Sequence, residues 1–402
     1  DRILELLWSI QSARPGMQRL ADRLATVFVP TVIALGLVAA AWVLLTGGSA
    51  VSALLIGLTV LIVSCPCALG LATPLAVAAG IREAADAGIV VVSEAVFEAV
   101  PEVDVVVFDK TGTLTTGEMR VAEVVGDDPD VIRDRAAAVE SRANHPVATA
   151  ITESADAPPE ATHFERHATG VSAVVDGDRV TVGRADLLRD EGLSIPSSLA
   201  QRAEGAAAAG QRSVFVGWDG QARGLLLLGE RERPEAAEVV AALSADHEVV
   251  VLTGDESGAV ERIEDHIDAD EVFAGVPPEA KAETVDRLRG RGTVAMVGDG
   301  SNDGPPLAAA DLGVALGSGT DLAADAADAV LLDDDLRNVA TLFDIANGTH
   351  GRIRQNLGWA FLYNGVAIPI AVAGLLNPLF AAVAMTASSL LVVVNSARSL
   401  RS

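Results

Sequence analysis

The chain has 402 residues, half of them hydrophobic, and carries a formal net charge of −26. A single soluble domain rarely combines so much apolar surface with so much charge, so the two must lie in separate regions. Such an acidic chain is a poor partner for nucleic acid, which we exclude. An acidic surface with almost no lysine is typical of a salt-rich cytoplasm. Only Lys110 and Lys281 occur, so each is expected to have a function that needs a compact ammonium group.

Two long stretches, residues 24–81 and 355–397, contain no Asp, Glu, Lys or Arg. Each is long enough for two membrane helices of about 20 residues joined by a short turn. One apolar run could be a buried core helix, but four uncharged runs in adjacent pairs favour a membrane. We therefore predict four transmembrane helices, at about residues 24–46, 51–80, 357–376 and 378–395.

Arginines flank the outer ends of both predicted helix pairs, whereas the two short turns carry no charge. By the positive-inside rule, both termini and the middle of the chain lie in the cytoplasm. Residues 1–23 are predicted to form a charged amphipathic helix and not a cleavable signal peptide. The sequence thus predicts a multi-pass protein of the cell membrane with lipid as a partner.

The middle of the chain, residues 82–354, is long enough for two soluble domains. Short β-branched runs end in polar residues and alternate with helical stretches, which is typical of a doubly wound α/β sheet. The predicted strands are 103–108, 249–252 and 294–297, and the predicted helices are about 233–245, 256–266 and 278–289. Ligands bind where such strands end, and Asp and Thr at three strand ends suit phosphate and magnesium.

Residues 120–228 interrupt this pattern with alternating apolar and polar residues. Residues 171–175 and 179–182, separated by Asp176 and Gly177, predict a hairpin in an antiparallel sheet. We interpret residues 120–228 as an inserted α+β domain.

The segment Asp109-Lys110-Thr111-Gly112-Thr113 resembles the phosphorylation signature of P-type ATPases. Further motifs follow in that family's order over essentially the whole chain, and an ordered set has a negligible chance rate. They are Cys65-Pro66-Cys67 and Glu140 to His145-Pro146, typical of the heavy-metal branch, then Thr253-Gly254-Asp255, Pro278-Glu279-Ala280-Lys281 and Gly298 to Asp303.

This resemblance implies a haloacid dehalogenase-like phosphorylation domain with an inserted nucleotide-binding domain. The phosphorylation domain would comprise residues 82–119 and 229–350, and the nucleotide-binding domain residues 120–228. The membrane helices would lie in residues 24–81 and 351–402.

The resemblance also implies a catalytic set. Asp109 would be the nucleophile that takes the γ-phosphoryl group of ATP, with Lys110 and Thr111 beside it. Lys281 would neutralise the transferred group and Thr253 would hydrogen-bond it. Lys281 as a solvated helix lysine and Thr253 as a helix N-cap are the alternatives, which the order of the motifs outweighs. Magnesium would be held by Asp109, the Thr111 carbonyl, Asp299 and Asp303.

ATP would be bound by two groups of residues. Glu140, His145, Gly170 and Gly183 are expected around the adenine, and Thr253, Gly254 and Asp255 near the phosphates. The chain departs from the family at Ala168, where a glycine is usual, and at Arg184, where an asparagine is usual. Both departures concern the approach of the backbone to the nucleotide.

Pro66 removes a backbone donor between Cys65 and Cys67 and is expected to break the helix and expose both thiolates. Two sulfur ligands without a nearby carboxylate favour a soft monovalent cation. A reduced pair is favoured, and two cysteines acting as small hydrophobic residues are the alternative.

The second helix pair resembles the copper-transporting subgroup, and it lacks the charged residue expected there in the zinc and cadmium subgroup. The transported ion is therefore expected to be Cu(I), with Ag(I) as a surrogate, and a copper chaperone is a candidate partner. The residues that carry this resemblance are Tyr363, Asn364, Met385, Ser388 and Ser389.

Pumps of this family have an actuator domain before the segment that opens here, and residues 1–23 resemble the helix that follows it. The chain is thus interpreted as the C-terminal portion of a copper-exporting pump that forms an aspartyl phosphate but hydrolyses it slowly. A membrane-tethered haloacid dehalogenase-like phosphatase is one alternative, although such enzymes usually have a second Asp where this chain has Thr111. A catalytically incomplete copper-binding fragment is the other.

Overall fold

The computed structural model describes residues 16–65, 67–208, 211–255, 267–299, 303–317 and 325–398. The predictions for residues 1–15, Pro66, the helix at 256–266 and residues 300–302 lie outside this description. The chain divides into two compact units, residues Asp1–Val103 with Asp311–Ser402, and residues Asp104–Ala310.

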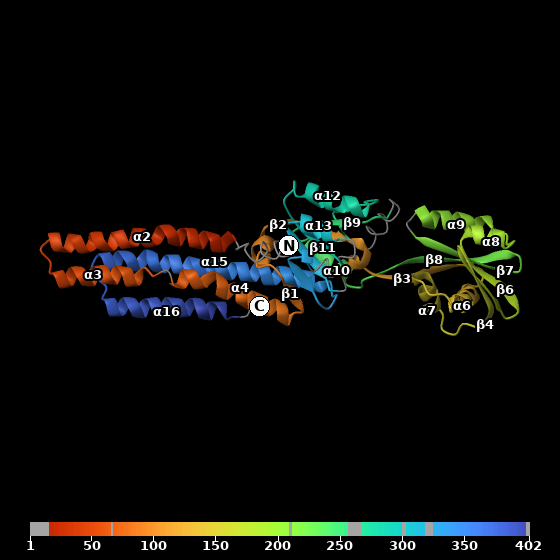
Figure 1. The fold of residues 1–402 in the computed structure, drawn as a ribbon, viewed down its shortest axis with the longest axis horizontal. Helices are drawn as coiled ribbons and strands as arrows, with labels where there is room; N and C mark the ends of the chain where they lie inside the picture. Colours follow the sequence, from red (N-terminus) through yellow and green to blue (C-terminus); the bar gives the residue numbers. More distant parts are fainter. Residues whose placement is uncertain are drawn as a thin grey trace, which may run out of the picture. The chain divides into compact units, whose positions relative to one another are not determined.

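The first unit contains the apolar helices. α2, α3, α15 and α16 lie side by side, and α4 packs against α15 and α16 (Figure 1). Two described helices are long and apolar enough to cross a membrane, one within α2 and the other α16, while α3 is shorter. The helices are α2 (Gly16–Leu45), α3 (Ala50–Val63), α4 (Cys67–Asp86), α15 (Arg337–Val372) and α16 (Pro378–Ser396).

The ends of these helices follow local chemistry. Ser49 caps α3 by accepting the Ser52 N–H at 3.1 Å, and Asn377 caps α16 by accepting the Leu379 N–H at 2.9 Å. The predicted span at 51–80 consists of two helices, because α3 ends at Val63 and α4 begins at Cys67. The predicted span at 357–376 is the C-terminal part of α15.

Three short strands also belong to the first unit, in the order β1-β13-β12. β1 pairs with β13 antiparallel, and β12 pairs with β13 parallel. A short helix and a 3₁₀ turn, α5 and η1, follow β1 and contact α15. The bounds are β1 (Ile89–Val91), α5 (Val96–Ala99), η1 (Val100–Glu102), β12 (Leu312–Leu316) and β13 (Ala329–Leu331).

In the second unit, four strands lie in the order β11-β2-β9-β10, and β2 pairs with β9 in parallel. The three predicted strands are confirmed, and the burial of β2, β9 and β11 explains their nearly continuous apolar runs. The bounds are β2 (Val103–Asp109), β9 (Glu248–Leu252), β10 (Glu271–Phe273), β11 (Thr293–Gly298), α10 (Ala236–Leu243), α12 (Pro278–Leu288) and α13 (Gly304–Ala309).

An antiparallel sheet with the order β3-β8-β7-β6-β5-β4 completes the second unit, and it contains the predicted hairpin. α6 and α7 cover one face, and α8 and α9 cover the other (Figure 1). The strands are β3 (Thr115–Gly126), β4 (Ala161–His167), β5 (Gly170–Val175), β6 (Asp178–Gly183), β7 (Arg212–Trp218) and β8 (Gln221–Glu232). The helices are α6 (Pro129–Glu140), α7 (Pro146–Glu153), α8 (Ala185–Asp190) and α9 (Ser197–Ala208).

Candidate functional site

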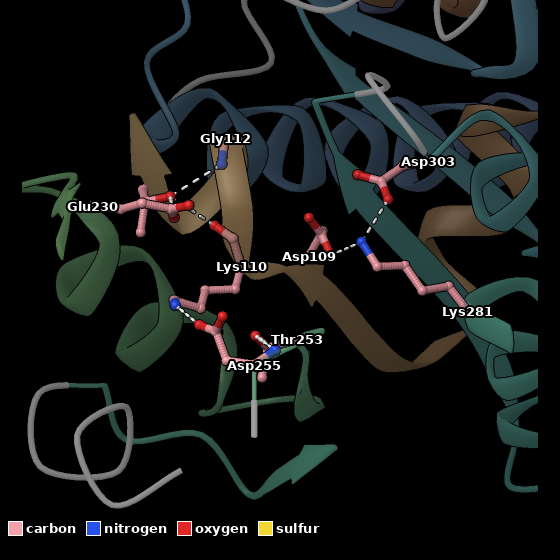
Figure 2. A network of polar contacts seen from close by, with 9 residues as sticks. Asp109, Lys110, Gly112, Glu230, Thr253, Asp255, Lys281 and Asp303 are labelled. Carbon is pink, nitrogen blue, oxygen red and sulfur yellow. Dashed lines mark hydrogen bonds and ion pairs between the residues drawn. The ribbon is translucent and has the colours of Figure 1, made fainter. Parts of the chain in front are cut away.

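A buried ion cluster lies at the C-terminal end of β2. Asp109 is the last residue of that strand, and Lys281 lies on α12. The Lys281 ammonium donates to Asp109 Oδ1 and, at 3.0 Å, to Asp303 Oδ1 (Figure 2). The three side chains are at most 9 % exposed. The structure therefore brings the predicted nucleophile and the predicted phosphoryl-binding lysine into direct contact.

The charges in this cluster do not balance. Burial and the nearby Asp303 carboxylate raise the pKa of Asp109, Lys281 opposes them, and the net pKa is about 7. Burial also raises the pKa of Asp303. Burial alone would lower the pKa of Lys281, but Asp109 and Asp303 hold it above its ordinary value. One ammonium group thus faces two buried carboxyl groups, so the positive charge in the cluster is insufficient to neutralise both carboxylates. A second cation would supply the missing charge.

The donor atoms near Asp109 fit magnesium. Asp299 follows β11, and its carboxylate lies so close to Gly112 that a Cβ on Gly112 would collide with it. The Oδ2 atom of Asp303 is buried and has no hydrogen-bond partner in the described chain. Mg²⁺ prefers carboxylate and carbonyl oxygens of this kind.

These carboxylates are not arranged as a ready metal site. Within the described ranges, no group of three or more His, Cys, Asp or Glu side chains is placed to hold a metal ion. The Lys281 ammonium instead contacts both Asp109 and Asp303.

The loop after Asp109, residues Lys110–Leu114, is fixed from several sides. Gly112 has a φ of 78°, which favours glycine, and its N–H donates to Thr115 Oγ1 at 3.0 Å. Thr115 donates to Glu230 at 2.7 Å, and Arg233 donates to the Gly112 carbonyl at 3.2 Å. Glu230 and Arg233 were not identified from the sequence. Their position, where the inserted domain ends and the chain returns to the α/β sheet, could have indicated that they contact the loop after Asp109.

The predicted residue Asp255, which follows β9, lies beside this loop. Lys110 forms an ion pair with Asp255 (Figure 2). The hydroxyl of Thr253 accepts the Asp255 N–H at 3.1 Å, as expected for a turn. Thr253 is buried, whereas Gly254 and Thr111 are exposed. Because β9 pairs with β2 so that Leu252 lies opposite Asp109, Thr253 follows directly at the same sheet edge.

The predicted adenine residues lie on α6, α7 and the β5–β6 hairpin. Glu140 ends α6 and is 3 % exposed, and its Oε2 atom lies 3.5 Å from His145 Nε2. His145 caps α7 through Nδ1, which accepts the Ala148 N–H at 3.0 Å. Burial raises the pKa of Glu140 to about 7. A carboxyl group with a pKa of about 7 is protonated in part of the molecules at neutral pH. Next to an imidazole, it can therefore donate as well as accept hydrogen bonds.

The two glycines of the predicted nucleotide site have a packing reason of their own. A Cβ on Gly170 would lie 2.6 Å from Gly183 Cα, and one on Gly183 would lie 2.6 Å from the Thr169 carbonyl oxygen. The Arg184 N–H donates to that same carbonyl at 3.0 Å. The backbones of neighbouring strands therefore approach too closely for any side chain.

The predicted metal residues lie on the apolar helices. Cys65 is half-buried just after α3, and the side chain of Cys67 lies outside the description. Met385 and Ser389 are half-buried on α16.

Three of the predicted metal residues carry buried oxygen atoms without hydrogen-bond partners in the part of the chain that is described. These atoms are Tyr363 Oη, Asn364 Oδ1 and Ser388 Oγ. The Thr73 hydroxyl on α4, which sequence reasoning missed, is a fourth. Other hydroxyls on these helices, such as those of Thr31 and Thr59, donate to the carbonyl four residues earlier. Unpaired oxygens among apolar helices are costly, so these atoms are candidates for contact with a bound ion or an ordered water.

Comparisons with known proteins place the chain in a family. Residues 103–311 match the model of haloacid dehalogenase-like hydrolases. The chain is 42% identical over 407 residues to "Probable copper-exporting P-type ATPase V" of Mycobacterium tuberculosis (strain CDC 1551 / Oshkosh), covering 99% of this chain and 53% of the relative. It is 42% identical over 408 residues to "Copper-exporting P-type ATPase" of Mycobacterium leprae (strain TN), covering 98% and 51%. The chain spans about half the length of the curated relatives it matches.

Solved structures agree with this assignment. A zinc-transporting PIB-type ATPase in the E2.Pi state has a TM-score of 0.86 and 34% identity, covering 100% of this chain and 67% of that chain. The catalytic domain of the CPx-ATPase CopB-B has a TM-score of 0.51 and 25% identity, covering 66% and 99%. This chain therefore belongs to the haloacid dehalogenase-like hydrolases and, within them, to the heavy-metal-transporting P-type ATPases.

Proposed function

We propose that the protein transfers the γ-phosphoryl group of ATP to Asp109 and couples this reaction to the export of Cu(I) across the cell membrane. The observation that carries the proposal is the buried contact of Asp109 with the Lys281 ammonium at the end of β2. An ionisable pair buried at the edge of a parallel sheet, with perturbed pKa values, is typical of a catalytic centre.

The proposed reaction is an in-line displacement. An oxygen of the Asp109 carboxylate forms a bond to the γ-phosphorus, the bond from that phosphorus to the β,γ-bridging oxygen breaks, and ADP leaves with the electron pair. The Lys281 ammonium would exchange its contact with the carboxylate for a contact with the phosphoryl oxygens and neutralise their charge. The Thr253 hydroxyl would donate a hydrogen bond to the same oxygens. With a pKa of about 7, part of Asp109 is in the nucleophilic carboxylate form near neutral pH, and the Lys281 ammonium favours that form.

The cofactors fit this reaction. Mg²⁺, when bound, would neutralise phosphate charge, and Asp109, Asp299, Asp303 and the Thr111 carbonyl would hold it. ATP would be recognised through its adenine by Glu140, His145, Gly170 and Gly183. Its phosphates would lie near Thr253, Gly254 and Asp255.

Cu(I) is favoured over Zn(II) on chemical grounds, although the relatives named for copper stand beside a structure named for zinc. Residues 355–397 carry no charged side chain, and the unpaired oxygens of Tyr363, Asn364 and Ser388 are neutral. A soft monovalent ion needs thiolate ligands and little added negative charge. Cys65 and Cys67, once reduced, with Met385 and Ser389, complete the proposed set, and Ag(I) would substitute.

The proposed topology is a multi-pass membrane protein with four spans and both termini in the cytoplasm. Two candidate spans within the described chain support part of it. α3 with α4, and the second half of α15, would supply the other two. Membrane lipid and a copper chaperone are the proposed partners.

Acid-quenched labelling of the whole chain with γ-labelled ATP tests the phosphorylation step. We expect hydroxylamine-sensitive label on the wild type and none on Asp109→Asn, because the amide has no nucleophilic oxygen anion. Asp104→Asn, at the other end of β2, is the matched control and should label normally. Label of equal intensity on Asp109→Asn would overturn the proposal, and rapid loss of label without metal during a chase would favour a phosphatase.

A further inference from the structure

A fully hydrogen-bonded amide lies where α4, α15 and α16 meet. Asn356 on α15 is 2 % exposed, and its Nδ2 atom donates to Ser396 Oγ at 2.9 Å and to the Ala72 carbonyl at 3.4 Å. Its Oδ1 atom accepts from Asn395 Nδ2 at 2.9 Å. One side chain thus connects the helix that begins at Cys67 with both helices of the C-terminal pair.

A second polar level lies further along the same helices. Asn364 follows Asn356 by about two turns on α15, and Ser388 precedes Ser396 by about two turns on α16. Between the two levels, Ala72, Ala360 and Val392 form a buried apolar cluster. The level at Asn356 has its hydrogen bonds made, whereas Asn364 Oδ1 and Ser388 Oγ have no partners in the described chain.

This contrast separates two roles. Contacts between apolar helix faces do not strongly fix how one helix is rotated or shifted relative to its neighbour, because many registers bury a similar area. A hydrogen bond from a side-chain amide to a backbone carbonyl of the neighbouring helix forms in only one relative position of the two helices. The bond from Asn356 to the Ala72 carbonyl therefore favours one position of α4 along α15. Ala72 lies about 7.5 Å along α4 from Cys67, at the rise of an α-helix.

We infer that Asn356 is a positioning residue for the proposed metal site. It holds α4, the helix that begins at Cys67, in one register against α15 and α16, the helices that carry Asn364 and Ser388. This inference rests on the proposed function, because it requires that these residues bind the transported ion. The Asn356 side chain itself does not bind the ion.

The test measures the Cu(I) affinity of the reduced chain in detergent by competition with a chromogenic chelator. We expect Asn356→Leu, which keeps the branched shape but removes the amide, to weaken binding about 10-fold, the lower end of the loss seen when residues that orient metal ligands are removed. Ser396→Ala should weaken it less, because the bond to Ala72 remains. Thr386→Val, on the same helix as Ser396, should leave it unchanged, because its hydroxyl bonds only within α16.

A double-mutant cycle with Ser388→Ala distinguishes positioning from general loss of packing. If Asn356 acts by placing α4 opposite Ser388, Asn356→Leu will lose most of its effect on affinity once Ser388 is already alanine. Additive effects, or wild-type affinity within twofold in Asn356→Leu, would overturn the inference. If Asn356→Leu does not fold, the same cycle with Ser396→Ala decides. Failure of the wild type to bind Cu(I) at all would instead refute the proposed function.

Discussion

The buried cluster around Asp109 and the seam between the apolar helices both contain buried polar side chains, but the two regions differ in how those side chains are paired. At Asp109 the buried groups are charged, and Lys281 contacts two carboxylates. In the seam formed by α4, α15 and α16, the buried groups are neutral, and the oxygens of Asn364 and Ser388 have no partner among the described residues. A cluster in which a buried ammonium already pairs with carboxylates is suited to the transfer of a charged group. Neutral oxygens without hydrogen-bond partners are suited to binding a cation of low charge.

The physical reason for the difference is the cost of desolvation. A buried carboxylate without a counter-ion is costly by several kcal/mol, so Asp109 needs Lys281 in the resting state. A buried hydroxyl without a partner costs about 1–3 kcal/mol, which a bound ion can offset. Four experiments can break or sharpen this comparison.

The largest effect is expected from Lys281→Met. Without the ammonium, the charge that develops on the transferred phosphoryl group loses its nearest counter-ion, and phosphorylation of Asp109 should slow by at least about 100-fold. Rapid-quench labelling measures this rate. Arg287→Met, on the same helix with its guanidinium bonded to Thr284, is the control and should label within twofold of wild type. A rate for Lys281→Met within threefold of wild type would refute the role of the pair.

Glu140→Gln tests a buried carboxyl group that has no ammonium partner. Its folded-state pKa of about 7 exceeds the unfolded value of 4.5, so the protonated form stabilises the fold. That contribution is present below pH 4.5, is lost as the pH rises to about 7, and amounts to about 3 kcal/mol.

We therefore expect Glu140→Gln to match the wild type near pH 5 and to be more stable near pH 8. Hydrogen exchange of the β3–β8 sheet at both pH values measures the difference. Equal protection in the two proteins at pH 8 would show that Glu140 does not titrate in this range.

Gly112→Ala tests the contact between the loop after Asp109 and the Asp299 carboxylate. A Cβ there would collide with the Asp299 carboxylate, and φ is 78°. We expect phosphorylation to fall about 10-fold or more, consistent with misplacement of catalytic groups. Gly117→Ala is the matched control, because its φ is 70° but its Cβ would only touch Gly112 at 3.8 Å. If both variants lose activity equally, backbone strain and not the collision is responsible.

The smallest effects are expected in the helix seam, where two serines should respond in opposite directions. Ser388→Ala removes an unpaired hydroxyl and should leave metal-free thermal stability unchanged or raise it slightly. Ser396→Ala removes the acceptor of the Asn356 amide and should lower stability by about 1 kcal/mol. Thermal unfolding in detergent without metal measures both. Destabilisation by Ser388→Ala of the same size would mean that its hydroxyl has a partner.

The strands and their polar ends were predictable from the sequence. Buried parallel strands need continuous apolar β-branched runs, and β2, β9 and β11 have them. Asp109 and Thr253 follow such runs directly, so the sheet edge could be located without coordinates. Helix bounds were less predictable, since a charge-free stretch marks the apolar part of a helix and not its start. α15 accordingly begins at Arg337.

The contacts that define the two sites were not predictable, because they join residues far apart in the chain. Glu230 meets Thr115 only once the inserted domain has folded, and Asn356 meets Ala72 only after the helices pack. A lone asparagine or glutamate has no local pattern that distinguishes these roles. Thr73 was missed because most threonines on apolar helices bond their own backbone.

We expect binding of the transported ion at Cys65 to control the phosphorylation of Asp109. The most direct measurement compares acid-quenched phosphorylation of the reduced chain with Cu(I), with Zn(II) and without metal, for wild type and Cys65→Ala. We predict that Cu(I) changes labelling severalfold in the wild type only, and that Zn(II) has no effect. Labelling that is the same with and without Cu(I), or the same response in Cys65→Ala, would contradict the account.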